Sequence, residues 1–174
     1  WHAGKSSWKK YKMINKNSIG IEISNQGHNF KYTSYNKKQI KSIVSLSNYL
    51  KKKYKIKKNC FLGHSDISPD RKIDPGELFP WKKLSKKNIG VWPNIKKEKL
   101  LLLRGQKLSN KETISFNNKL KHFGYMRLSQ IIKNQNFYRR KLYKVFQMRF
   151  RPELINGKID KECLKILNEI NTLK

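Results

Sequence analysis

Acidic residues are scarce in this sequence. The 174 residues include 11 Asp and Glu against 41 Lys and Arg, which gives a formal net charge of +30. Such a charge attracts polyanions, including nucleic acid, an anionic membrane face and a wall polymer rich in carboxylates. Most of the basic residues are lysines spread along the chain, which is typical of a solvated surface or of a compositional bias. Charge alone therefore does not identify a partner.

Specific nucleic-acid binding has no support in the sequence beyond this charge. The chain contains no helix-turn-helix pattern, no RNP-type aromatic motif and no zinc-finger spacing. We therefore expect no specific nucleic-acid partner, and a basic nucleic-acid-binding protein is kept only as a remote alternative.

Cysteines and long apolar runs are also scarce. Cys60 and Cys163 lie far apart and form neither a CxxC motif nor a cluster with histidine. One disulfide is conceivable, but the pattern favours two small buried apolar residues. Apolar runs such as 100–103 are far too short to cross a bilayer. Because the chain begins at Trp1 with no leader-like region, we expect a fragment or processed product, and membrane association only through a lost N-terminal anchor.

The first half of the chain has the pattern of an α/β fold. Isoleucines alternate with other residues over 18–23, which predicts a strand that places Glu22 on the face opposite the isoleucines. Apolar residues at a spacing of three and four predict a helix over 37–54, capped by Asn36. A short apolar run predicts a second strand over 59–63. Strand, helix and strand in this order are the crossover unit of an α/β sheet.

The second half has the pattern of a linker followed by a small helical bundle. Ser109 and Glu112 fit a capping box that opens a helix, and Asp160 is placed to open another. The predicted helices cover residues 77–84, 111–123, 137–150 and 161–173. The predicted organisation is one domain over 1–94, a linker over 95–110 and a three-helix domain over 111–174.

Chemistry-bearing residues gather between Gly63 and Trp81. His64 follows a short apolar run, and Asp74 comes ten residues later across a segment rich in turn formers. A loop of this kind can bring an imidazole and a carboxylate together, and both are ligand types that zinc accepts. By itself such a pair is more often a hydrogen-bonded loop contact than a metal site.

Four blocks of the sequence together resemble one enzyme family. They read WHAG at residues 1–4, SIGIE at 18–22, GHSD at 63–66 and RKIDPG at 71–76. In this order they resemble the type 2 N-acetylmuramoyl-L-alanine amidases, zinc amidohydrolases of bacterial peptidoglycan, and in particular their AmpD/AmiD branch. The resemblance implies an α/β fold with a mixed sheet flanked by helices, shared with the peptidoglycan-recognition proteins. It also implies Zn²⁺ as cofactor and hydrolysis of the amide bond between N-acetylmuramic acid and L-alanine.

The resemblance assigns roles to four residues. His64 and Asp74 match two of the family's three zinc ligands. Lys72 matches the lysine that stabilises the tetrahedral oxyanion by its charge, and Glu22 matches the glutamate read as general base. The remaining family ligand is a histidine on a strand before the WHAG block. The resemblance therefore implies that this third ligand is absent from the chain, and that zinc binding and activity are impaired.

Peptidoglycan or muropeptides are the partners that the resemblance implies, and we expect a monomer. The residues expected to line the substrate cleft are Trp1, His2, Asn25 and His28. In the second half, the Phe146-Gln147 pair and the turn from Gly157 to Asp160 resemble the three-helix peptidoglycan-binding module. A plain helical bundle explains the same two features.

Beside the remote nucleic-acid alternative, one other function remains an alternative to the amidase. A non-catalytic peptidoglycan-binding protein would use the same cleft and the C-terminal module. The missing histidine favours this alternative, whereas the four retained site residues, Glu22, His64, Lys72 and Asp74, argue against it. An amidase followed by such a module is typical of an envelope enzyme, so we expect the periplasm or outer membrane, with the cytoplasm as the alternative.

Overall fold

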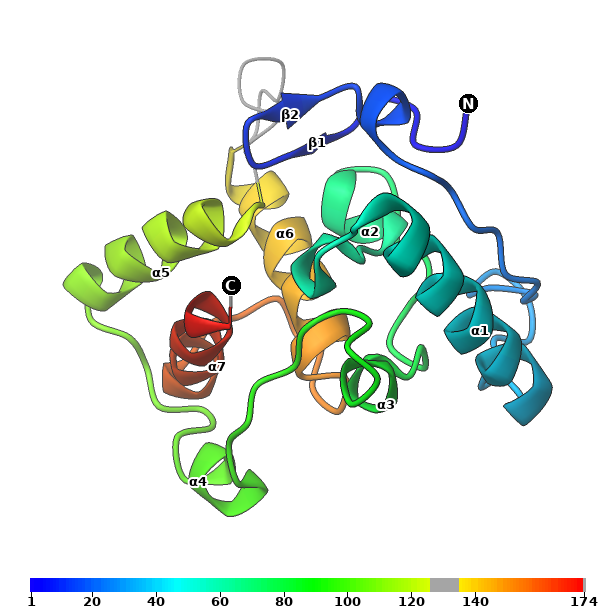
Figure 1. The fold of residues 1–174 in the computed structure, drawn as a ribbon. Helices are drawn as coiled ribbons and strands as arrows, with labels where there is room; N and C mark the ends of the chain where they lie inside the picture. Colours follow the sequence, from blue (N-terminus) through cyan, green and yellow to red (C-terminus); the bar gives the residue numbers. More distant parts are fainter. Residues whose placement is uncertain (126–134, 174) are drawn as a thin grey trace.

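The computed structural model of this protein describes residues 1–125 and 135–173. Its helices and strands are, in chain order, β1 Ser7–Trp8, β2 Tyr11–Lys12, α1 Lys37–Tyr54, α2 His64–Ile67, α3 Trp81–Ser85, α4 Lys97–Leu101, α5 Asn110–Phe123, α6 Gln135–Phe150 and α7 Lys161–Thr172. Two short 3₁₀ turns lie at Ile14–Asn17 and Lys58–Cys60. In Figure 1, α6 runs through the middle of the molecule, with α5 and α7 on one side and α1, α2 and α3 on the other.

The helix predicted over 37–54 is present with the same bounds as α1. Asn36 accepts a hydrogen bond from the backbone N–H of Gln39, and the Gln39 side chain accepts one from the Asn36 N–H, so a capping box closes the first turn. Lys55 ends the helix with a φ of 52°. The apolar stripe of α1 packs through Ile43 against the aromatic residues around α3.

The strands predicted over 18–23 and 59–63 are wrong for this structure. Residues 18–24 form no helix or strand, and Lys58–Cys60 is a 3₁₀ turn. Neither segment has a ladder partner within residues 1–125 and 135–173, and a strand exists only through such pairing. The expected buried face is also open to solvent, since Ile19 is 51% and Ile21 39% exposed. In the described part of the chain, the sheet consists of the two antiparallel strands β1 and β2, each two residues long, with Trp8 paired with Tyr11.

The three helices predicted for the second half are confirmed as α5, α6 and α7. Ser109 and Glu112 form the expected capping box, and the Asp160 side chain accepts from the backbone N–H of Cys163. The helix predicted over 77–84 is shorter, because α3 begins only after Pro80. The predicted linker 95–110 contains α4 and is held to α7, where Lys161 N donates to Gln106 O.

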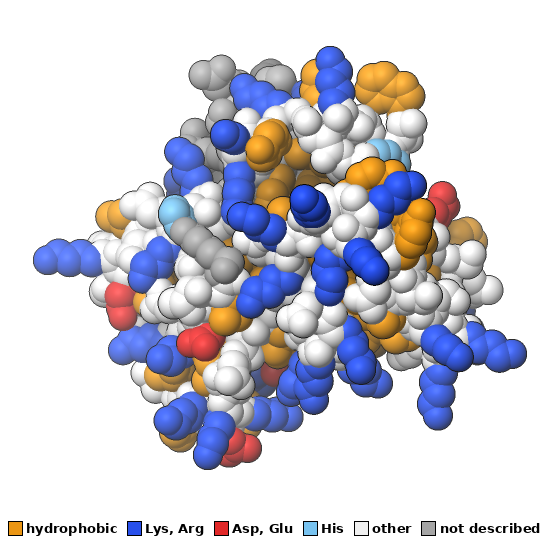
Figure 2. All heavy atoms as spheres, in the orientation of Figure 1, with side chains coloured by type: hydrophobic (Ala, Val, Ile, Leu, Met, Phe, Trp, Pro, Cys, Tyr) orange, Lys and Arg blue, Asp and Glu red, His pale blue; other side chains and the backbone are white. Residues whose placement is uncertain are grey.

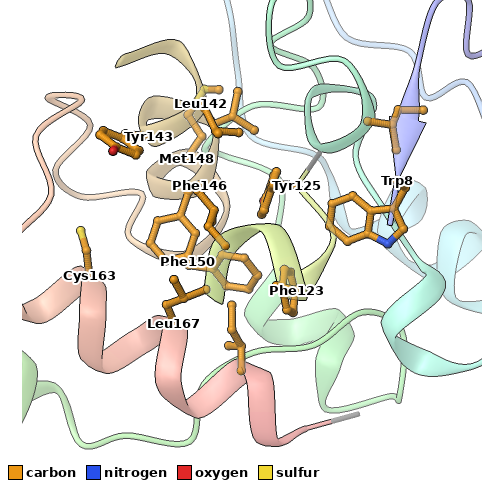
Figure 3. Close-up of a cluster of buried hydrophobic side chains, with 14 of the residues drawn as sticks. Trp8, Phe123, Tyr125, Leu142, Tyr143, Phe146, Met148, Phe150, Cys163 and Leu167 are labelled. Atoms are coloured by element: carbon orange, nitrogen blue, oxygen red, sulfur yellow. The ribbon is translucent and has the colours of Figure 1, made fainter. Parts of the chain in front are cut away.

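Two hydrophobic clusters form the interior. The larger one joins α5, α6 and α7 to the N-terminal hairpin, with Trp8 packed edge-on against Phe123 and Tyr125 (Figure 3). The smaller one surrounds Trp81, and Trp92 packs against both. The larger cluster therefore draws side chains from both sides of the predicted division into domains. That division stays a prediction, and its second part includes residues 126–134 and 174, which lie outside the described residues.

Lysines and arginines dominate the surface without gathering into one patch on the face in view (Figure 2). None of the helices in the described part of the chain combines the length and apolar character that a bilayer-crossing segment requires. Both cysteines are free thiols. The prediction that they are buried is confirmed for Cys163, whereas Cys60 is exposed at the end of its 3₁₀ turn.

Candidate functional site

His64 and Asp74 meet, as the sequence predicts. His64 Nδ1 lies 3.0 Å from Asp74 Oδ2. His64 opens the one-turn helix α2, and the next residue, Ser65, donates its backbone N–H to the carbonyl oxygen of Asp74 at 2.9 Å. Two bonds therefore join α2 to the segment that carries the carboxylate. The imidazole is mostly enclosed, with 21% of its side chain exposed, whereas 58% of the Asp74 side chain faces solvent.

Lys72 acts on the same carboxylate. Partial burial by itself raises the pKa of the Asp74 carboxyl, but the hydrogen bond and charge of His64 and the positive charge of Lys72 outweigh this effect and hold the pKa below its ordinary value. Three predicted site residues thus share one electrostatic environment. An anionic carboxylate beside an imidazole and an ammonium can hold a cation and, next to it, a developing negative charge.

Two of the predicted zinc ligands lie together as a pair of possible donors. Imidazole nitrogen and carboxylate oxygen both suit zinc, and they already lie within hydrogen-bond distance of each other. His64 Nε2 is buried and has no hydrogen-bond partner among the described residues, so the ring is not engaged elsewhere through that atom. Within residues 1–125 and 135–173, no group of three or more His, Cys, Asp or Glu side chains could hold a metal ion. The pair fits zinc in its chemistry and supplies two protein ligands.

The loop after Asp74 is held by two tyrosines. Tyr32 and Tyr35 both donate their hydroxyls to the carbonyl oxygen of Pro75, at 2.7 and 2.9 Å. Gly76 has a φ of +80°, and a Cβ on it would lie 2.3 Å from the Tyr32 hydroxyl, so this position requires glycine. The glycine of the RKIDPG block therefore allows the tyrosines to reach the backbone beside the carboxylate.

The N-terminal WHAG block is held by Arg71. Its guanidinium donates to the carbonyl oxygens of Ala3, at 2.7 Å, and Lys5, at 2.9 Å. Ser68 donates its hydroxyl to the same Lys5 oxygen at 2.8 Å. Two of the family-like blocks, distant in sequence, are thus joined directly beside the site. The sequence pattern gave no sign of this contact.

The aspartate of the GHSD block, Asp66, is buried at 2% exposure and has partners from two distant segments. Tyr125 donates its hydroxyl to Asp66 Oδ1 at 2.5 Å, and Arg149 of α6 donates from Nη1 to Asp66 Oδ2. Asp66 Oδ2 also accepts from the backbone N–H of Gly63 at 2.7 Å. Burial, together with the negative charge of Asp66, holds the pKa of Tyr125 well above its ordinary value. The sequence prediction missed this arrangement, because its partners lie far away along the chain.

The other predicted residues are not bonded to this pair in the described structure, although His28 lies against Gly76, two residues after Asp74. Glu22 is exposed and lines a groove of about 400 Å³ between residues 21–24 and α1, and no hydrogen bond or ion pair joins it to His64 or Asp74. Trp1 is 97% exposed. Each of the other three predicted cleft residues has a hydrogen-bond partner. The partners are Ser18 Oγ for His2 Nε2, Thr33 O for Asn25 Nδ2 and Glu77 Oε2 for His28 Nε2.

In the C-terminal helices, the two features that resemble the peptidoglycan-binding module bond to each other. Gln147 is fully buried, accepts from the backbone N–H of Gly157 at 2.8 Å and donates to the carbonyl oxygen of Lys158 at 2.8 Å. Gly157 has a φ of +70°, and a Cβ there would lie 2.8 Å from Arg140 Cγ. The motif therefore has a folding role that these contacts explain without a ligand.

Comparison with known proteins gives one consistent family. The family described as N-acetylmuramoyl-L-alanine amidase matches residues 1–77. The N-acetylmuramoyl-L-alanine amidase AmiD of Escherichia coli is 35% identical over 171 residues, which are 95% of this chain and 61% of that protein. The 1,6-anhydro-N-acetylmuramyl-L-alanine amidase AmpD of Haemophilus influenzae is 42% identical over 84 residues, 48% of this chain and 44% of that protein. The chain thus spans less than two thirds of the length of either relative.

The fold comparison agrees. The structure of E. coli AmiD in complex with anhydro-N-acetylmuramic acid-L-Ala-D-γ-Glu-L-Lys superimposes with a TM-score of 0.83 at 31% identity, covering 99% of this chain and 68% of that one. The likeness includes the C-terminal helices as well as the segment with the four blocks. It confirms the α/β amidase fold class expected from the sequence, although the two predicted strands are unpaired here.

Proposed function

This chain belongs to the N-acetylmuramoyl-L-alanine amidase family, and we propose that it serves the hydrolysis of the amide bond between N-acetylmuramic acid and L-alanine in peptidoglycan or muropeptides. The observation that carries the proposal is the contact of His64 with Asp74 beside Lys72. Support for the substrate comes from the muropeptide named in the E. coli AmiD complex.

In this proposal His64 and Asp74 would hold a zinc ion. When bound, zinc would lower the pKa of the attacking water and polarise the amide carbonyl. Lys72 places a positive charge where negative charge develops on the carbonyl oxygen. Glu22 receives the proton of the attacking water and passes it to the leaving amine. The role of Glu22 rests on the family likeness and requires that residues 18–24 carry its carboxylate to the pair.

Two protein donors hold zinc less tightly than three, so we propose that the 174 residues bind zinc weakly and act slowly. Binding of peptidoglycan by α5–α7 and a location in the periplasm or outer membrane belong to the same proposal.

The test is the zinc-dependent release of peptide. We would incubate the chain with an anhydro-N-acetylmuramic acid tripeptide, with added zinc or with a chelator, and follow the free peptide by chromatography and mass spectrometry. We expect slow release with zinc, none with the chelator, and a loss of at least about tenfold in His64→Ala and Asp74→Asn, since each removes a ligand. His122→Ala is the matched control, because this histidine lies on α5 and has no role in the proposed site.

One outcome would contradict an amidase, and a second would contradict the assignment of His64 and Asp74 as ligands. If the muropeptide binds with equal affinity with and without zinc and is never cleaved, the chain is a non-catalytic peptidoglycan-binding protein. If release persists unchanged in both ligand variants, the reaction does not use this pair.

A further inference from the structure

A buried contact joins Arg149 to Asp66, which lies in the one-turn helix that carries His64. Arg149 lies near the C-terminal end of α6 and is 3% exposed. Its Nη1 donates to Asp66 Oδ2, and its Nη2 donates to the carbonyl oxygen of Phe61 at 2.9 Å. One guanidinium thus binds the chain on both sides of His64.

The position of this guanidinium is fixed by aromatic rings. Its centre lies 4.0 Å from the centroid of the Trp81 ring and 5.2 Å from that of Phe150. A planar cation stacked in this way is attracted by the ring faces and loses rotational freedom. Arg149 is therefore a rigid support, unlike a surface arginine that changes partners.

The contact is coupled to the site through one turn of helix. Asp66 lies in α2, two residues after His64, and its carboxylate also accepts from Gly63 N at the start of that turn. Ser65, between them, donates its N–H to the carbonyl oxygen of Asp74. A rotation of α2 would therefore move His64 relative to Asp74 and break the Ser65 bond together with the pair.

We propose that Arg149 is a positioning residue for the zinc pair, so that the C-terminal helices set the geometry of His64 and Asp74 through Asp66. This role rests on the proposed function only for its purpose, since the contacts themselves join protein atoms. The helices would then be part of the support of the site, in addition to any binding that they perform.

A matched control lies two residues away. Arg151 is also buried, at 1% exposure, and its Nη1 donates to Asp160 at 2.6 Å and to Glu162 at 3.1 Å. These partners belong to the start of α7 and not to α2. Arg149→Met and Arg151→Met therefore both remove a buried arginine, but only the first removes a contact with the segment that carries His64.

The first measurement is amide hydrogen exchange by NMR in the metal-free chain, at a temperature where both variants are folded. In Arg149→Met we expect the Ser65 amide to lose at least about tenfold of its protection relative to the amides of Ile166 and Leu167 in α7. In Arg151→Met we expect the opposite order, with α7 affected more than Ser65. Equal loss at Ser65 in both variants would overturn the proposal, because it would indicate general destabilisation.

The second measurement is zinc affinity, by competition with a chromophoric chelator. Arg149→Met should weaken zinc binding by about tenfold to a hundredfold, as is typical when a residue that holds a metal ligand in position is changed. Arg151→Met should leave the zinc affinity within about twofold of that of the unchanged chain. Unchanged affinity in Arg149→Met would overturn the coupling. If the unchanged chain binds no zinc, the proposed function fails, whereas the exchange measurement still decides the role of Arg149.

Discussion

At the scale of single residues, the charges next to Asp74 set the pKa of its carboxyl group and thereby its contribution to folding stability. Asp74 has a pKa below its ordinary value of 3.8, although its side chain is largely open to solvent. A carboxyl whose pKa is lower in the folded state stabilises the fold above its unfolded pKa. That contribution is lost as the pH falls through the lower, folded pKa.

The pH dependence gives the first prediction. In metal-free protein, the difference in unfolding free energy between the unchanged chain and Asp74→Asn should be present at about pH 5 and shrink as the pH falls below about 4. Denaturant titrations across that range measure it. A difference that grows on acidification would have the wrong sign and would refute the lowered pKa.

The two thiols give a second prediction. Cys163 is fully buried, and burial raises its pKa to about 12, whereas Cys60 is exposed. Because the thiolate is the nucleophile, iodoacetamide at pH 8 should alkylate Cys60 and spare Cys163 until the chain is unfolded. Peptide mass spectrometry with and without denaturant measures the alkylated fraction of each cysteine. Labelling of Cys163 in native protein at the rate of Cys60 would contradict its burial.

The meeting of His64 and Asp74 could be predicted, because the two lie ten residues apart in one turn-rich loop. The residues that hold this loop could not. Tyr125 and Arg149 reach it across 59 and 83 residues of sequence, and Arg71 within it reaches Ala3 across 68, contacts that only the folded chain makes. Nothing in local spacing distinguishes them from the other polar residues of the chain.

At the scale of elements, caps and apolar periods carried enough information for the long helices. The bounds of α1, and the starts of α5 and α7, follow from Asn36, Ser109 and Asp160, whose side chains accept from backbone N–H groups. The strands could not be judged in the same way. Alternation over 18–23 describes a segment suited to pairing, but pairing depends on a second segment at the right place.

Asp160 supports a third prediction, at the start of α7. Its Oδ1 caps the helix through Cys163 N, and its Oδ2 accepts from Arg151 and from Gly105 N. Asp160→Ala should lower the unfolding free energy by about 3–5 kcal/mol, since it breaks a buried charge pair. Asp160→Asn should cost about 1 kcal/mol less, because an amide oxygen still caps.

Thermal and denaturant unfolding of both variants measure this difference. A change in Asp160→Ala of under about 0.5 kcal/mol, the range of ordinary surface substitutions, would show that the pair carries no net stability.

At the scale of the whole molecule, the interior is shared between the two halves of the chain. Trp8, Ile67 and Val91 belong to the same cluster as the apolar faces of α5, α6 and α7. We therefore predict that residues 1–110 alone do not fold, because removing the helices exposes this apolar surface to water. The amide region of a proton–nitrogen NMR spectrum decides this directly. A dispersed spectrum from the isolated fragment would support an independent first domain.

The net charge of +30 gives a prediction for the whole chain. Like charges repel more strongly in the compact state, and salt screens that repulsion within about 10 Å at 0.1 M. The melting temperature should therefore rise as sodium chloride is raised from about 0.01 to 0.3 M, with a Debye length falling from about 30 Å. Sucrose at matched osmolarity controls for general solute effects. A falling melting temperature would indicate that attractive ion pairs outweigh the repulsion.

The hydrogen bonds from Arg71 to the N-terminal segment determine which substitutions this part of the chain tolerates. Its guanidinium holds the carbonyl oxygens of Ala3 and Lys5, groups that every amino acid possesses. Substituting the exposed Lys5 side chain therefore leaves the anchorage intact, whereas Arg71→Lys removes the planar fork that reaches both oxygens. This contact is therefore sensitive to substitution of Arg71 and insensitive to substitution of Lys5. A deep mutational scan would show that position 5 accepts many residues, whereas position 71 accepts few.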